Sequence, residues 1–329
     1  MNQQPLSDGS ILLRATEEDD AEGFVHAVWL FPGVGLMFID IRSAHWPNKD
    51  LTGPNGGLVK GAFLLNYSVS GSCKVLLDND SYVLQKQGDL SVSGHFAKED
   101  YFYPEGYYQG LEFLVDPAQA ERSIGASAPG GIPDWFGLDF AALLQQYDVP
   151  GQTKIGACPA SLRDTLSTLW AMYPFGLEDP ALPPETLAAM RGETLRVFQK
   201  LQLEPASLSG SRRPTFKPQQ MRVAEQAMTL LREDLRRDWT LPELAEAIGI
   251  SESSLKRYFQ QLYGCSVAKY QRNARMERAA ELLRSPEHRA LSVLDVALEV
   301  GYENQSKFAA AFKRMFGESP LEYKKNAIL

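Results

Sequence analysis

The chain has 329 residues, of which 44% are hydrophobic and 22% charged, a composition typical of a globular protein with two or three domains. It has no apolar run of the roughly 20 residues that a membrane-spanning helix needs, and its polar first ten residues do not resemble a signal peptide. Cys73, Cys158 and Cys265 are widely separated, which favours reduced thiols over a disulfide framework or a zinc site. These features predict a cytoplasmic protein without membrane contact.

The net charge of −8 is distributed unevenly along the chain. From residue 211 onward, 20 Lys and Arg stand against 15 Asp and Glu, a net charge of +5. Residues 1–210 hold 13 basic and 26 acidic residues, a net charge of −13. This asymmetry indicates that only the C-terminal part meets the phosphates of nucleic acid, although an ordinary basic surface would have the same charge.

The first part of the chain is predicted to be rich in strands. Between Gly61 and Asp116 apolar residues recur with a period of two, and turn residues separate the runs. The clearest alternations are Tyr82 with Leu84, Leu90 with Val92, and Leu111 with Phe113 and Val115. Short, closely spaced strands of this kind predict an antiparallel sandwich or barrel over residues 1–118.

After residue 118, apolar residues recur at the spacing of a helix. A helical extension is predicted over residues 119–204, where it could cover the sheet or form a dimer interface. Its apolar positions are Leu162, Leu166, Leu169 and Tyr173, then Leu187, Met190, Val197, Phe198 and Leu201. Residues 205–218, rich in Ser, Pro and Arg, are typical of a linker, and residues 219–329 are predicted to be almost entirely helical. The fold class is therefore α+β.

The helical part contains an internal repeat. A segment from Leu244 to Tyr270 recurs from Val296 to Tyr323, with an offset of 52 residues that becomes 53 at the pair Ser251 and Asn304. Repeated small and apolar residues predict two crossing helices, repeated glycines predict helix ends, and Ser251 and Asn304 are predicted to cap the helices that follow. Each copy predicts a helix, a tight turn and a second helix with an exposed polar front.

The second copy carries most of a recognisable signature. It comprises Ala280-Glu281-Leu282-Leu283, Val293, Val296-Ala297, Val300-Gly301-Tyr302, Gln305-Ser306, Phe308, Phe312-Lys313-Arg314, Phe316-Gly317, Ser319-Pro320 and Tyr323. In order, spacing and residue type, about residues 220 to 329 resemble the AraC/XylS family of bacterial transcription regulators. The resemblance implies a seven-helix domain with two helix-turn-helix units that read successive major-groove segments of promoter DNA.

DNA-reading residues are expected at the fronts of the two second helices. On the first they are Ser253, Ser254, Lys256 and Arg257, and on the second Gln305, Ser306 and Lys307. Lys and Arg donate to guanine O6 and N7, whereas the same residues could also simply solvate a helix face. Ala309 and Ala310 occupy the positions equivalent to Lys256 and Arg257, so we expect the first unit to supply most base discrimination. A structural ion pair between Asp295 and Arg275 is also predicted.

The resemblance further implies that the strand-rich part is a cupin-like sensor of a small-molecule effector. Tyr101, Tyr103, Tyr107 and Tyr108 could line its pocket, although packing residues of a sheet would have the same composition. The four histidines are not closely paired, and His95 with Glu99 is the nearest approach to a metal-ligand set. No catalytic residue, metal or cofactor is therefore expected.

The sequence as a whole predicts a transcription regulator, more often an activator in this family, whose partners are promoter DNA, RNA polymerase, an unidentified effector and possible second copies of the chain. Two alternatives stay open. One is a ligand-binding or enzymatic cupin with a vestigial helical tail, which salt-dependent binding of promoter DNA would exclude. The other is a general nucleoid-type DNA binder, which footprinting would distinguish.

Overall fold

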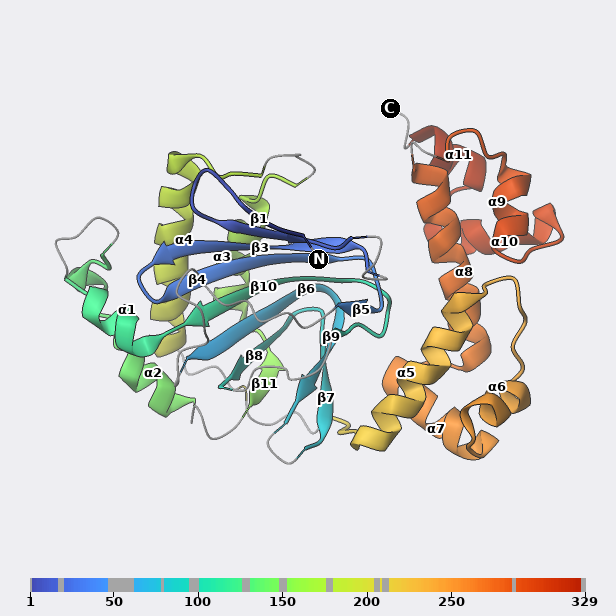
Figure 1. Cartoon of the computed structure of the whole chain (residues 1–329), viewed down its shortest axis with the longest axis horizontal. Helices are drawn as coiled ribbons and strands as arrows, with labels where there is room; N and C mark the ends of the chain where they lie inside the picture. The colour runs from blue at the N-terminus through green and yellow to red at the C-terminus, as the bar shows by residue number, and fades with distance from the viewer. Residues whose placement is uncertain are drawn as a thin grey trace. The chain divides into compact units, whose positions relative to one another are not determined.

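In the computed structural model, the chain divides into two units, residues 1–218 and 219–329 (Figure 1). The structure describes residues 2–16, 21–46, 62–77, 80–94, 101–125, 131–147, 153–175, 180–203, 208, 213–285 and 288–326. The predicted pair His95 and Glu99, and much of the predicted linker, lie outside these ranges.

The first unit is built on a large antiparallel sheet (Figure 1). Its strands lie in the order β1-β2-β3-β4-β10-β6-β8-β11, with β7 also paired to β6, and β5 pairs separately with β9. The bounds are β1 Asn2–Pro5, β2 Ile11–Arg14, β3 Gly23–Phe31, β4 Val34–Ile41, β5 His45–Trp46, β6 Phe63–Leu76, β7 Tyr82–Lys86, β8 Asp89–Ser93, β9 Tyr101–Phe102, β10 Tyr108–Val115 and β11 Lys154–Ala157. The runs predicted from the period of two fall in β7, β8 and β10, so those predictions are confirmed.

Both faces of this sheet are buried. Leu111, Phe113 and Val115 of β10 belong to the larger hydrophobic core, which includes the helices, whereas Tyr108 of the same strand belongs to a second cluster. Alternate residues of a strand point to opposite faces, so the two clusters lie on opposite sides of the sheet. Glu112, between Leu111 and Phe113, is consequently held on the second side, where only 8% of its surface is exposed.

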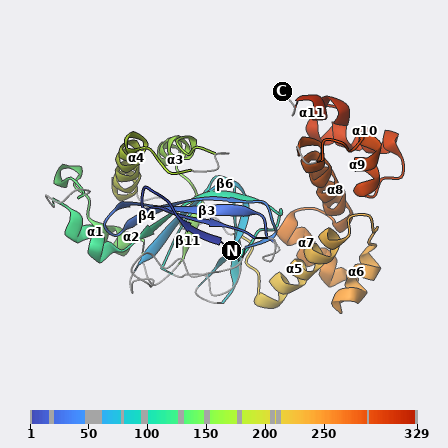
Figure 2. The same ribbon diagram turned by 45° about the horizontal axis from the view of Figure 1, so that its top comes forward.

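Helices cover the first face of the sheet (Figure 2). They are α1 Pro117–Ser123, α2 Phe140–Gln146, α3 Ala160–Ala171 and α4 Pro184–Leu203, with a short 3-10 helix at Asp134–Phe136. Apart from the half-buried Leu187, the apolar positions predicted from helical spacing are buried, in α3, in α4 and at Tyr173 just after α3. Pro184 begins α4. Proline suits this position because the first N–H of a helix has no partner within the helix, so its absence costs nothing.

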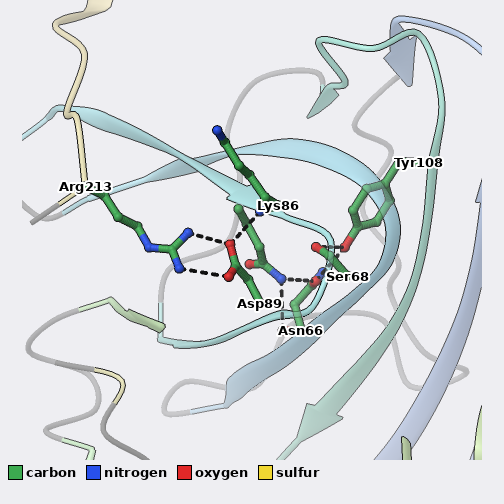
Figure 3. Close-up of polar contacts among 7 residues, drawn as sticks. Asn66, Ser68, Lys86, Asp89, Tyr108 and Arg213 are labelled. Atoms are coloured by element: carbon green, nitrogen blue, oxygen red, sulfur yellow. Dashed lines mark hydrogen bonds and ion pairs between the residues drawn. The ribbon is translucent and has the colours of Figure 1, made fainter. Parts of the chain in front are cut away.

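The end of the predicted linker is attached to the sheet of the first unit. Phe216 forms an isolated antiparallel bridge with Tyr82, and each backbone N–H donates to the carbonyl of the other at 2.8 Å. Three residues earlier, the Arg213 guanidinium pairs with the Asp89 carboxylate at the start of β8 (Figure 3). The chain is therefore held on the β7–β8 hairpin just before α5 begins at Pro218.

The described residues of the second unit form seven helices, as the resemblance implies. They are α5 Pro218–Glu233, α6 Leu241–Ile248, α7 Glu252–Tyr263, α8 Val267–Arg284, α9 Val293–Glu299, α10 Gln305–Phe316 and α11 Pro320–Asn326. Across the described part of both units, no helix is long and apolar enough to cross a membrane.

Candidate nucleic-acid interface

The helix pair α6 and α7 is delimited by its own side chains. At the start of α6, Thr240 and Glu243 form a capping box, in which each side chain serves the other residue's backbone N–H. Gly249 ends the helix in the left-handed region at φ 79°, and the Ser251 hydroxyl then accepts from the backbone N–H of Ser254. Ala245, 2% exposed, provides the small side chain that a close helix crossing requires.

The pair α9 and α10 repeats this construction. Ser292 and Asp295 form the capping box of α9, Gly301 follows the helix at φ 79°, and the Asn304 side chain accepts from the backbone N–H of Lys307. The caps predicted at Ser251 and Asn304 are both confirmed. The predicted ion pair between Asp295 and Arg275 is wrong, because the Asp295 carboxylate instead accepts from the backbone N–H of Ser292 at 2.8 Å.

The apolar faces of α7 and α10 point into the domain. Leu255 and Phe259 of α7, and Phe308 and Phe312 of α10, are fully buried. Residues four apart lie on one face of a helix, so each helix turns its opposite, polar face to solvent. Burial of the apolar face thus decides which side chains remain accessible to a ligand.

The residues predicted to read DNA lie on these accessible faces. Ser253, Lys256 and Arg257 are exposed on α7, and Gln305, Ser306 and Lys307 are exposed on the first turn of α10. Ser254 is half-buried, and its hydroxyl accepts from Ser251 at 3.0 Å, so it also supports the cap. The guanidinium of Arg257 lies 5.0 Å from the ring centroid of Tyr258, its neighbour in the sequence. Ala310, in the position equivalent to Arg257, is exposed.

A loop between α5 and α6 holds the two helix pairs together. From α8, the buried Arg275 donates through Nε to the carbonyl of Leu235 at 2.7 Å and pairs with Asp238 at 2.7 Å. From the second pair, Gly301 lies so close that a Cβ atom there would be 2.8 Å from the Leu235 carbonyl oxygen. The sequence analysis predicted a structural ion pair for Arg275, but with a different partner.

The aromatic residues predicted as pocket-lining do not all lie together. Tyr103 and Tyr108 stack with ring centroids 5.1 Å apart in the second hydrophobic cluster, against which Tyr101 packs. Tyr107 is 40% exposed. Three of the four residues therefore share one buried region on the second side of the sheet.

Polar residues that the sequence analysis missed accompany these tyrosines. The Tyr108 hydroxyl donates to Asn66 Oδ1 at 2.6 Å and lies 3.2 Å from the Ser68 hydroxyl (Figure 3). Asn66 also accepts from Gln85 Nε2 and donates to Glu112 Oε2, both at 2.8 Å. Burial raises the pKa of the Glu112 carboxyl, an effect that the hydrogen bond from Asn66 partly offsets. Their signal in the sequence was weak, because a strand with one polar face is usually solvated on that face.

Comparison with known proteins supports the assignment of the helical unit. Residues 244–326 match the family model described as "Helix-turn-helix domain". An uncharacterized HTH-type transcriptional regulator of Haemophilus influenzae is 34% identical over 103 residues, which are 31% of this chain and 34% of that protein. The probable transcription factor PqrA of Proteus vulgaris is 31% identical over 86 residues, 26% of this chain and 68% of that protein.

Some relatives also match beyond the helical unit. A putative AraC-like transcription regulator of Streptomyces antibioticus is 28% identical over 218 residues, which are 64% of this chain and 69% of that protein. The match to the Haemophilus influenzae regulator, in contrast, spans only about a third of its length. The shared feature of these relatives is the regulation of transcription.

Proposed function

Because the chain belongs to the AraC/XylS family of DNA-binding transcription regulators, we propose that α6–α7 and α9–α10 are two helix-turn-helix units that read one promoter site. Their second helices, α7 and α10, would enter successive major-groove segments, which repeat about every 34 Å on one side of the duplex. The loop held by Arg275 and Gly301 would keep the two units in register.

The observation that carries this proposal is that α7 and α10 both expose the polar side chains of their first turn. Both α7 and α10 begin with a side-chain cap, bury two large apolar residues and leave a polar first turn accessible. If these polar side chains were buried, neither helix would have a group that could contact base edges. The basic charge of residues 211–329 supplies the accompanying attraction to phosphate.

The two units differ in what they can donate to DNA. Arg257 would form the main base contact and Lys256 a base or phosphate contact, aided by Ser253 and Ser254. On α10, Gln305 would contact a base, with Ser306 and Lys307 beside it, whereas Ala309 and Ala310 can only touch a thymine methyl group. The first helix-turn-helix unit, α6–α7, would therefore dominate sequence discrimination.

Residues 1–218 would act as a cupin-like sensor. Within them, residues 1–118 would be the sensor domain, residues 119–204 a helical extension for dimerisation and residues 205–218 the linker. A small-molecule effector bound there would change how the sensor restrains the DNA-binding unit, and the regulator would activate transcription through RNA polymerase in the cytoplasm. The buried polar group around Asn66 and Tyr108 supports this proposal, because recognition pockets combine aromatic walls with a few polar atoms.

Genome-wide mapping of bound sites, followed by footprinting with the purified full-length protein, tests the function directly. We expect a protected site with two half-sites about one helical turn apart, and loss of that protection when Lys256 and Arg257 are both changed to Ala. Protection without sequence preference would instead identify a nucleoid-type binder. Equal operator affinity and equal transcription with every ligand tried, including after deletion of residues 1–210, would contradict the sensor role.

A further inference from the structure

A basic pocket lies between α8 and α10, apart from the residues proposed to read bases. It has a volume of about 200 Å³ and is lined in part by Lys269, Arg272 and Asn273 of α8 and by Arg314 of α10, with Met276 and Met315 forming apolar wall. Among its eight lining residues, all of which the structure describes, there is no Asp or Glu.

The charge of this pocket is unbalanced. Lys269 and Arg272 are three residues apart on one helical face, where like charges repel each other. Arg314 adds a third positive charge from the other helix. Two other basic residues of α8 have acidic partners: Arg278 pairs with Glu281 at 3.0 Å and Arg275 pairs with Asp238. An anion in the pocket would offset the repulsion.

We propose that this pocket binds a phosphate group. Two guanidinium groups and one ammonium group suit the geometry and charge of phosphate, since guanidinium donates two parallel hydrogen bonds and ammonium acts as a point charge. The Asn273 amide adds a neutral donor. The buried Met276 forms an apolar wall of the pocket.

The pocket is separate from the base-reading front of α10. Arg314 follows Gln305 by nine residues, about 13 Å along a helix axis. Nine residues make two and a half helical turns, so Arg314 also lies on the side of α10 opposite Gln305. The phosphate could belong to the DNA backbone or to a free phosphorylated molecule, and these two sources share the same recognition chemistry.

The test compares two double variants of the full chain that lose the same charge. Arg272→Gln with Arg314→Gln removes charge from the pocket, whereas Arg278→Gln with Arg289→Gln removes it from exposed positions elsewhere in the same unit. In the first arm, thermal unfolding without DNA is followed in inorganic phosphate and in KCl of equal ionic strength. We expect phosphate to raise the Tm of the wild type and the control by a few degrees, and not that of the pocket variant.

In the second arm, affinity for promoter DNA is measured against salt concentration. A backbone phosphate in the pocket would make the slope of log K against log salt smaller by about 1 in the pocket variant than in the control. An effect in the first arm alone identifies a free phosphorylated molecule as the source, and an effect in the second arm alone identifies DNA. Identical behaviour of the two variants in both arms overturns the proposal.

Only the second arm rests on the proposed function. If neither the wild type nor the variants bind promoter DNA, the proposed function fails. The first arm alone then decides whether the pocket binds phosphate. Far-UV circular dichroism of each variant establishes that the charge changes leave the helices folded.

Discussion

Arg213 pairs with Asp89 through two hydrogen bonds, one of them from Nη2 to Oδ1 at 2.8 Å, and so holds the end of the predicted linker on the sheet. The pair is largely shielded from water, with side-chain exposures of 19% and 8%. Asp89 also accepts from the backbone N–H of Lys86 at 2.7 Å, which fixes the carboxylate within the β7–β8 turn (Figure 3). Together with the Phe216 bridge, the pair fixes the residues before α5 on this hairpin.

Breaking this pair is expected to loosen the end of the linker. Asp89→Asn should lower the free energy of local opening at Phe216 by about 1–3 kcal/mol, because a shielded charge-assisted pair is lost. Hydrogen exchange of the Tyr82 and Phe216 amides, which donate to each other's carbonyls, measures this opening. Arg42→Gln is the control, since its 65% exposed side chain lies 3.7 Å from Asp40. Unchanged exchange at Phe216 in Asp89→Asn would show that the bridge holds without the ion pair.

Gly301 and Gly249 allow a direct test of the contact between the helix pairs. Both have φ 79°, where a Cβ atom costs about 1–2 kcal/mol, but only Gly301 is close to another backbone segment. Gly301→Ala should therefore destabilise the helical unit by about 1–3 kcal/mol more than Gly249→Ala. Hydrogen exchange of α8 amides reports both variants on the same helix. Equal losses would mean that the loop around Leu235 moves aside without cost.

The proposed difference between the base contacts of α7 and α10 predicts which substitution weakens DNA binding more. Arg257→Ala should weaken specific binding by about 1–3 kcal/mol, because it removes a charged donor to a base edge. Gln305→Ala should weaken specific binding by less than Arg257→Ala does. Titrations of both variants against the same operator at fixed salt measure the difference, with a nonspecific duplex as control. A larger loss in Gln305→Ala would reverse the assignment.

The buried carboxyl of Glu112 predicts a pH-dependent stability. Its folded-state pKa is raised, so the folded chain holds this proton more tightly, and its contribution to stability declines as the pH rises above the ordinary value of 4.5. Glu112→Gln should raise the Tm at neutral pH, and the gain should shrink as the pH falls toward 4.5. Thermal unfolding between pH 5 and 8 tests this, with the exposed Asp164→Asn as control. A gain independent of pH would assign the effect to packing.

The residues of the candidate interface could be located from the sequence because their structure is determined locally. An N-cap such as Ser251 or Asn304 acts on N–H groups two or three residues away, and Phe308 and Phe312 fix the buried face of α10 by spacing alone. The same holds for the strands of the first unit that show a period of two. These features depend on near neighbours, so the pattern of residue types carries them.

Partners far apart in the sequence were decided only by the tertiary structure. Arg275 was predicted to bind Asp295 but pairs with Asp238, because Asp295 is engaged in its own capping box and the α5–α6 loop offers Arg275 two backbone carbonyls besides. Glu112 looks solvated in a strand that alternates, yet burial of both sheet faces encloses it. Likewise, no local pattern joins Arg213 to a carboxylate 124 residues earlier. Such pairings depend on where folding brings the backbone, which residue spacing alone does not encode.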